Sequence, residues 1–244
     1  MTPNRVDDPL LVVVVPRASL VRPGLRTPRA AAIAGIIFSV LLICSLWLLW
    51  RSVPVDPLDA GLWLQTHSRR VSLALSLVPF AGIAFFWFLG VLRDRLGEKE
   101  DQFFATVFLG SGLMFLGMLF VAASAMGGLI RAHSAGSGEL PGSAAFAFAR
   151  AFTYNVMQIY ALKMAGVFMI TTSTLALKTN LTTRWIALLG YALAALLLIG
   201  SGYLDWVLFI FPAWVLLVSL YILIDNLRES PGAGAKPGAR QIFT

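Results

Sequence analysis

Polar side chains interrupt a long apolar stretch in the second half of the sequence. Within "NVMQIYALKMAGVFM" (155–169), Asn155, Gln158 and Lys163 introduce two amides and an amine, and Thr174 adds a hydroxyl soon after. Such groups donate and accept hydrogen bonds, so together they suit an anionic or polar solute. A lysine at the centre of a membrane helix costs about 2.5–3.5 kcal/mol, which its surroundings must offset. These four residues are therefore the ligand-binding candidates.

The position of Lys163 along the chain places it deep in the predicted membrane helix. Arg150 and Lys178 flank it in sequence, and at 1.5 Å per residue each lies about 20 Å away. A turn of about 100° per residue puts the polar residues on one side of the helix. We expect that side to face the bundle interior and to line a polar cavity around Lys163.

Three other arrangements of Lys163 remain open. Its amine can pair with Asp205 across a difference in depth, pair with an acid on another chain, or extend toward the headgroups while its stem packs. Arg150 is the better partner for Asp205, because both are expected near the same membrane interface. We predict a structural ion pair between Arg150 and Asp205.

The patterns required by intramembrane enzymes are missing, so we expect no catalytic residue and no enzyme. The "GSG" at 110–112 lacks a partner histidine in a helix core, and the sequence has no His-Glu-x-x-His motif. The acids and histidines expected on one side of the membrane lack metal-ligand spacing, so we expect no metal and no cofactor. They are Asp59, His67, His133 and Glu139.

Composition indicates the elements that must position these residues. Of 244 residues, 58% are hydrophobic and 13% charged, whereas soluble domains carry about 25% charged residues. About 20 apolar residues in a helix cross the hydrocarbon core. The predicted spans cover residues 30–50, 71–92, 103–130, 151–177, 183–200 and 204–224.

We therefore predict an all-α, polytopic transmembrane bundle of six spans in a domain over residues 30–224. The fifth span is the shortest, and a re-entrant hairpin is the alternative there. The segments 1–29 and 225–244 are predicted to be disordered, and the "LLVVVV" near the start is too short to span. Cys44 lies alone inside the first span, where we expect a small buried side chain.

Basic residues are unevenly distributed between the two sides, which predicts orientation. One side carries Arg17, Arg22, Arg26, Arg29, Arg93, Arg95, Lys99, Lys178, Arg184, Arg228, Lys236 and Arg240. The other side carries Arg51, Arg69, Arg70 and Arg131. Both termini are therefore predicted to be cytoplasmic. The net charge of +7 is spread over short flanks, so it does not indicate nucleic-acid binding.

Two helices carry small residues at helical spacing. Gly110, Gly117 and Ser124 recur in the third span, and Gly190 and Ala194 in the fifth. Small residues let neighbouring helices approach closely. We predict that both stripes are packing faces.

The layout resembles the uncharacterised six-span integral membrane proteins of high-GC bacteria, which have short loops, an Arg-rich start and Ala-, Leu- and Gly-rich helices. The resemblance covers roughly residues 27–228 and transfers no functional residue. It implies a multi-pass protein of the bacterial plasma (inner) membrane. Two functions are carried forward: a small permease-like or ligand-binding protein for an anionic or polar solute, or a non-catalytic component that binds partner membrane helices.

Overall fold

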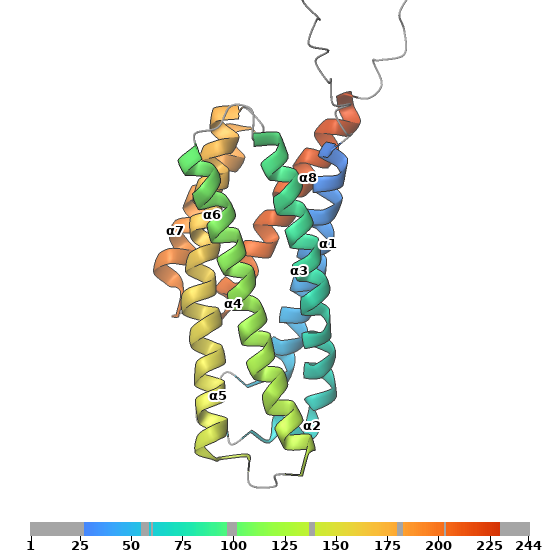
Figure 1. Ribbon diagram of the computed structural model, residues 1–244, viewed down its shortest axis with the longest axis vertical. Helices are drawn as coiled ribbons and strands as arrows, with labels where there is room; N and C mark the ends of the chain where they lie inside the picture. The colour runs from blue at the N-terminus through green and yellow to red at the C-terminus, as the bar shows by residue number, and fades with distance from the viewer. Residues whose placement is uncertain are drawn as a thin grey trace, which may run out of the picture.

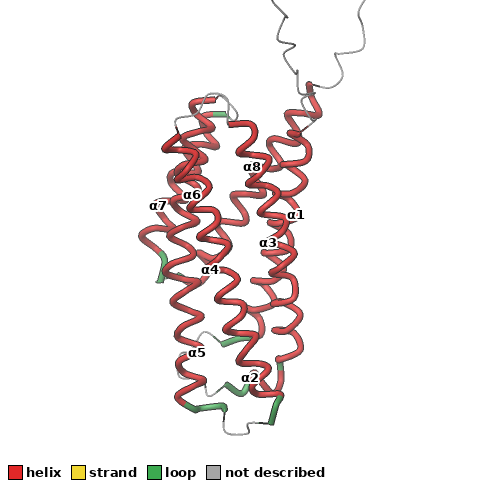
Figure 2. The backbone as a smooth tube through the Cα atoms, viewed as in Figure 1, coloured by secondary structure: helices red, strands yellow, loops and turns green. Residues whose placement is uncertain are grey.

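The computed structural model describes residues 27–54, 59, 61–96, 102–136, 140–179, 183–202 and 204–229, and these are helical with no strand (Figure 1; Figure 2). The longer helices are α1 (Thr27–Ser52), α3 (Ser68–Leu96), α4 (Gln102–Ser134), α6 (Leu162–Thr179) and α8 (Ile210–Glu229). The shorter ones are α2 (Trp63–Thr66), α5 (Ala144–Tyr154), the π-helix η1 (Asn155–Ala161), α7 (Arg184–Gly200) and the 3-10 helix η2 (Asp205–Phe209). The predicted all-α fold is confirmed.

The predictions for the two chain ends fall mostly outside this description. Residues 1–26, with the "LLVVVV" segment, and residues 230–244 are not among the described ones. The first and last helices extend slightly into the segments predicted to be disordered, because α1 begins at Thr27 and α8 ends at Glu229.

Helices α5, η1 and α6 form one continuous helical run. Ser143 starts it, because its side chain accepts a hydrogen bond from the Phe146 N–H at 3.2 Å. Gly142 precedes this cap with φ of 79°, a left-handed conformation that glycine adopts without a steric cost. The run then continues to Thr179 without an intervening loop.

Within the part of the chain that the structure describes, five segments are long and apolar enough to cross a membrane. They are Ala30–Ser52, Ser68–Arg93, Phe103–Ser134, Ala144–Lys178 and Asp205–Asp225. Helix α7 has 17 residues, which is about 25 Å at 1.5 Å per residue, less than the roughly 30 Å of hydrocarbon. The structure thus supports a multi-pass membrane protein and leaves α7 as a shorter apolar helix.

The helices pack side by side as an elongated bundle (Figure 1). α1 packs between α3 and α8, α4 packs between α3 and α6, and α7 lies against α6. The start of α1 and the end of α8 lie at one end of the bundle, here called the terminal end. α2 and the start of α5 lie at the opposite end, here called the α2 end, and α7 stops well short of it.

Phenylalanine rings fill the middle of the bundle. Phe38, Phe85, Phe115, Phe168 and Phe211, from five different helices, are each at most 1% exposed. The ring centroids of Phe38 and Phe85 are 4.6 Å apart, as are those of Phe115 and Phe211. These are contact distances for aromatic pairs. This group, here called the phenylalanine core, ties five helices together.

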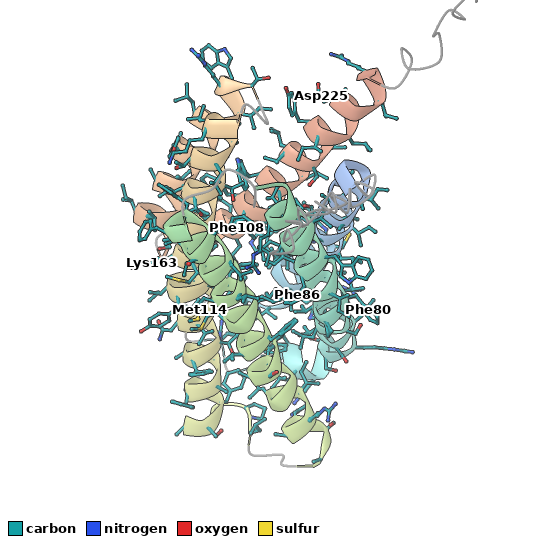
Figure 3. All side chains as sticks on the ribbon, turned by 45° about the horizontal axis from the view of Figure 1, so that its top comes forward. Phe80, Phe86, Phe108, Met114, Lys163 and Asp225 are labelled. Carbon is teal, nitrogen blue, oxygen red and sulfur yellow. The ribbon has the colours of Figure 1, made fainter. Side chains whose placement is uncertain are left out.

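Large apolar side chains also cover the outside. Phe80 is 63% exposed and Phe86 57% exposed, and both lie on α3 (Figure 3). Similar residues are exposed on α1, α4, α7 and α8. Soluble monomers rarely expose such continuous apolar surface, so the surface itself supports a membrane environment. Cys44 is exposed on α1, so the expectation that it is buried was wrong.

The two predicted stripes of small residues behave differently. Gly190 and Ala194 are buried, and a Cβ at Gly190 would collide with Ser173 Oγ of α6, so this packing face is confirmed. Gly110 and Gly117 are exposed, with nothing within 4 Å of where their Cβ atoms would lie. The prediction of a packing face on α4 was therefore wrong within this chain, because the neighbours of α4 contact its other sides.

Candidate functional site

A cavity of about 210 Å³ lies between α1, α5, η1 and η2, in the half of the bundle nearer the α2 end. Its walls are mainly apolar, with Leu46, Leu49, Trp50, Met126, Met157, Leu208 and Phe209 among them. Its polar lining residues are Arg150, Thr153, Tyr154, Gln158 and Asp205. Ligand sites have this composition, in which apolar walls carry a few placed polar groups.

The amide of Gln158 is the most buried polar group of the cavity. The residue is 4% exposed, and its Oε1 has no hydrogen-bond partner among the described residues. A buried acceptor without a partner costs about 1–3 kcal/mol. The oxygen itself has almost no accessible surface, so Gln158 is a buried polar residue whose side chain borders the cavity.

The π-helix is the local cause of this placement. The N–H of Leu162 donates to the carbonyl of Met157, five residues back instead of four. Such a wide turn holds one extra residue and rotates the side chains around it relative to a regular α-helix. Single π-turns occur frequently at functional sites. Here the turn directs Val156 and Gln158 inward.

Arg150 is fixed by the connection between α1 and α2. Its Nη2 donates to the carbonyl of Pro54 at 2.6 Å, and its Nη1 donates to the carbonyl of Asp59 at 3.3 Å. The same connection packs closely on α5, because a Cβ at Gly61 would lie 2.7 Å from the Phe146 ring. The guanidinium is thereby held at the edge of the cavity, and its other N–H groups have no acceptor among the described residues.

Asp205 also lines the cavity, from the first position of η2. It is half-buried and forms no ion pair with Arg150 or with another described residue. The predicted partners thus share one cavity without a direct ion pair. The physical reason is that the two carbonyls of the α1–α2 connection hold the guanidinium.

A smaller cavity of about 70 Å³ adjoins the first. Leu46, Leu49, Met126, Thr153 and Met157 line both. Its other lining residues are apolar except Ser45, whose hydroxyl donates to the carbonyl of Ala74 at 2.8 Å. The two cavities therefore form a polar chamber with an apolar side chamber.

The structure does not bring the four predicted ligand-binding residues together. Lys163 is exposed at the flank of the bundle and does not line the cavity (Figure 3). Asn155 is also exposed. Thr174 lies toward the terminal end, where its hydroxyl is 2.6 Å from that of Tyr191. Only Gln158 faces the cavity, so the polar cavity is centred on Gln158 and not on Lys163.

Sequence reasoning missed the role of the α1–α2 connection and of Thr153. Asp59 offers its backbone carbonyl to Arg150, and α2 begins only at Trp63. No sequence pattern signals such a contact between a carbonyl and a side chain 91 positions later. The one indication in the sequence was that Arg150 and Asp205 were both expected near the same membrane interface.

Among the described residues, neither a second hollow nor a group of metal ligands forms a better site. A hollow of about 670 Å³ lies on the outside of α2 and α3, but all its lining residues, including Arg69 and Arg70, are exposed. Within the described ranges, no three His, Cys, Asp or Glu residues group in a way that holds a metal ion. The cavity at Gln158 is therefore the best-formed candidate.

Comparison with known proteins gives no assignment for this chain. No family model matches it, and neither a curated protein nor a solved structure does.

Proposed function

We propose that the protein binds a small polar solute in the cavity at Gln158, as a permease-like or ligand-binding protein of the bacterial plasma membrane. The proposal includes six membrane crossings with both termini in the cytoplasm. The start of α1 and the end of α8 lie at one end of the bundle, which supports an even number of crossings (Figure 1). The bias of basic residues toward that end supports a cytoplasmic location for it.

The short helix α7 is compatible with six crossings. Arg184 at its start and Ser201 after its end bracket about 25 Å of apolar helix. Local thinning of the bilayer accommodates a short span at fractions of a kcal/mol per Å. Helix α7 also packs along α6, so it need not meet lipid on every side.

One observation carries the functional proposal: a cavity between apolar helices is lined by two charged residues, Arg150 and Asp205, and by Gln158. A purely structural cavity between membrane helices is expected to be apolar and dry. Here a carboxylate, a guanidinium and an amide converge instead. Their arrangement on a π-helix and a 3-10 helix supports a binding role.

The test asks whether water and small solutes reach the cavity. Thr153 lines both chambers and is close to cysteine in size. In a Cys44→Ala background, we expect Thr153→Cys to react with the membrane-impermeant anion sulfonatoethyl methanethiosulfonate added outside right-side-out vesicles. The thiolate is the reacting species, and it forms only where water enters. Modification is read from the mass of the purified protein.

The matched control is Gly117→Cys on the exposed face of α4. In lipid its thiol has no water and meets no charged reagent, so we expect no modification before unfolding. If Thr153→Cys is equally unreactive in vesicles, but reacts after unfolding, the cavity is closed and the proposal is wrong. If Thr153→Cys reacts only when the reagent is added on the cytoplasmic side, the cavity is open to water but the proposed orientation is wrong.

A second function is supported by the outer surface of α4. Gly110 and Gly117 leave an open strip with nothing packed on it, and Lys163 is exposed on the run that packs beside α4. A partner helix with a carboxylate fits both features. Under this alternative, Lys163→Met lowers recovery of a membrane complex in mild detergent, while labelling of Thr153→Cys is unchanged.

A further inference from the structure

We infer that the cavity selects a small zwitterion with an apolar part, such as a neutral amino acid or the headgroup of a zwitterionic lipid. The anionic group lies at Arg150 and the cationic group at Asp205, in the cavity that Gln158 also lines. The inference rests on the proposed function, since it names the chemical class of the solute that this cavity binds.

Arg150 is prepared for an anion. Two of its five N–H donors are used by the carbonyls of Pro54 and Asp59. These contacts hold the guanidinium plane in place without neutralising its charge, because carbonyls are uncharged. A carboxylate or phosphate can accept from the remaining donors of such a planar fork.

Asp205 is prepared for a cation. Its carboxylate lines the same cavity from η2 and has no ion-pair partner among the described residues. An ionised carboxylate next to mainly apolar walls is costly unless it is paired. An ammonium group of a ligand supplies both a charge and N–H donors.

The separation of the two charges is what selects a zwitterion. If Arg150 and Asp205 formed an ion pair, the cavity would attract neither charge. Because the α1–α2 connection holds Arg150, both charges stay available in the same cavity. A ligand with only one charge leaves the other residue unpaired, whereas a zwitterion pairs both.

The size of the cavity limits the ligand. Its volume of about 210 Å³ is below the roughly 300–1,000 Å³ of sites for drug-sized molecules. The side chamber beyond Met157 and Leu46 accepts an apolar group. A free amino acid with an aliphatic side chain fits this division, and so does a lipid headgroup whose chain leaves the cavity.

The test measures protection of Thr153→Cys from the same thiol reagent by defined probes. Free leucine carries both charges, N-acetylleucine only the negative one, and leucinol only the positive one. Nanodiscs of phosphatidylethanolamine, compared with phosphatidylglycerol, present the lipid source. We expect leucine, or phosphatidylethanolamine, to protect at concentrations at least about tenfold lower than the singly charged analogues, because each of those leaves one charge unpaired.

Asp205→Asn is the matching variant, because it removes the charge and keeps the shape. In this variant leucine and N-acetylleucine should protect equally. If N-acetylleucine or leucinol already protects the parent protein as well as leucine, or if no probe protects a cysteine that does react, the zwitterion inference is wrong and the water-filled cavity stands. If Thr153→Cys does not react at all, the proposed function itself fails.

Discussion

The phenylalanine core and the cavity are built by the same parts of the chain, a few turns apart. In the core, Phe38 of α1 and Phe168 of the long α5–α6 run are fully buried in a ring cluster. Toward the α2 end, Leu46 of α1 and Met157 of that run line an open space. The residues in both places are mainly apolar, so hydrophobicity does not explain the difference.

The backbone explains it. Around the core, α1, α3, α4 and α6 are regular α-helices, whereas the cavity is bordered by the π-helix η1 and the 3-10 helix η2. The wide turns of a π-helix and the tight turns of a 3-10 helix rotate side chains away from the directions they would have in a regular α-helix. We infer that the change of helix type opened the bundle where the polar groups gather.

Removing a buried ring from the phenylalanine core should lower the free energy of unfolding more than any other substitution discussed below. Phe85 is fully buried, whereas its sequence neighbour Phe86 is 57% exposed. We expect Phe85→Ala to lower the free energy of unfolding by about 3 kcal/mol, at the low end for such truncations because the surrounding solvent is lipid and not water. Phe86→Ala should change it by less than about 0.5 kcal/mol.

Reversible unfolding in mixed micelles, followed by circular dichroism, measures both variants. Equal losses would show that Phe86 is also packed, and the assignment of the outer face of α3 would then be wrong.

Alanine substitutions in the two glycine stripes should change the stability by smaller amounts, and the changes at Gly190 and Gly117 should differ in sign. At Gly190 a Cβ would collide with Ser173 Oγ and lie 3.0 Å from Trp214 Nε1. We expect Gly190→Ala to destabilise by about 1–3 kcal/mol through overpacking. Gly117→Ala meets nothing within 4 Å and should be neutral or stabilising by up to about 1 kcal/mol, since alanine is the better helix former. Thermal unfolding in one detergent compares them.

The same two variants also test whether a partner helix packs on α4. If Gly117→Ala destabilises the protein in native membranes but not in detergent, a partner helix occupies the exposed strip. Equal effects at Gly190 and Gly117 in detergent would contradict the packing described for α7.

The glycine stripes show what sequence can and cannot predict here. Long apolar runs predicted the helices, because backbone in lipid must bond within its own segment. Spacing alone gave the same prediction for Gly117 and Gly190, yet only Gly190 has a neighbour. Which face of a helix is covered depends on the other helices, and no local pattern contains that information.

The candidate site was partly predictable for the same reason. Gln158, Arg150 and Asp205 stood out as polar residues in apolar surroundings, and all three line the cavity. The predicted grouping of Gln158 with Lys163, Asn155 and Thr174 failed. It assumed a regular turn of about 100° per residue through 155–161, where the chain forms a π-helix that the sequence did not signal.

The smallest expected effect concerns Lys163. Its side chain is exposed and does not line the cavity. Lys163→Met should therefore leave both the labelling of Thr153→Cys and its protection by leucine unchanged. Lys178→Met is the control. It removes a cation–π contact with Phe104, 4.1 Å from the ring centroid, worth about 0.5–1 kcal/mol, so unfolding measurements should detect it more readily than Lys163→Met. If Lys163→Met instead abolishes labelling or protection, the lysine faces the cavity in the membrane, and the separation between outer surface and binding chamber is wrong.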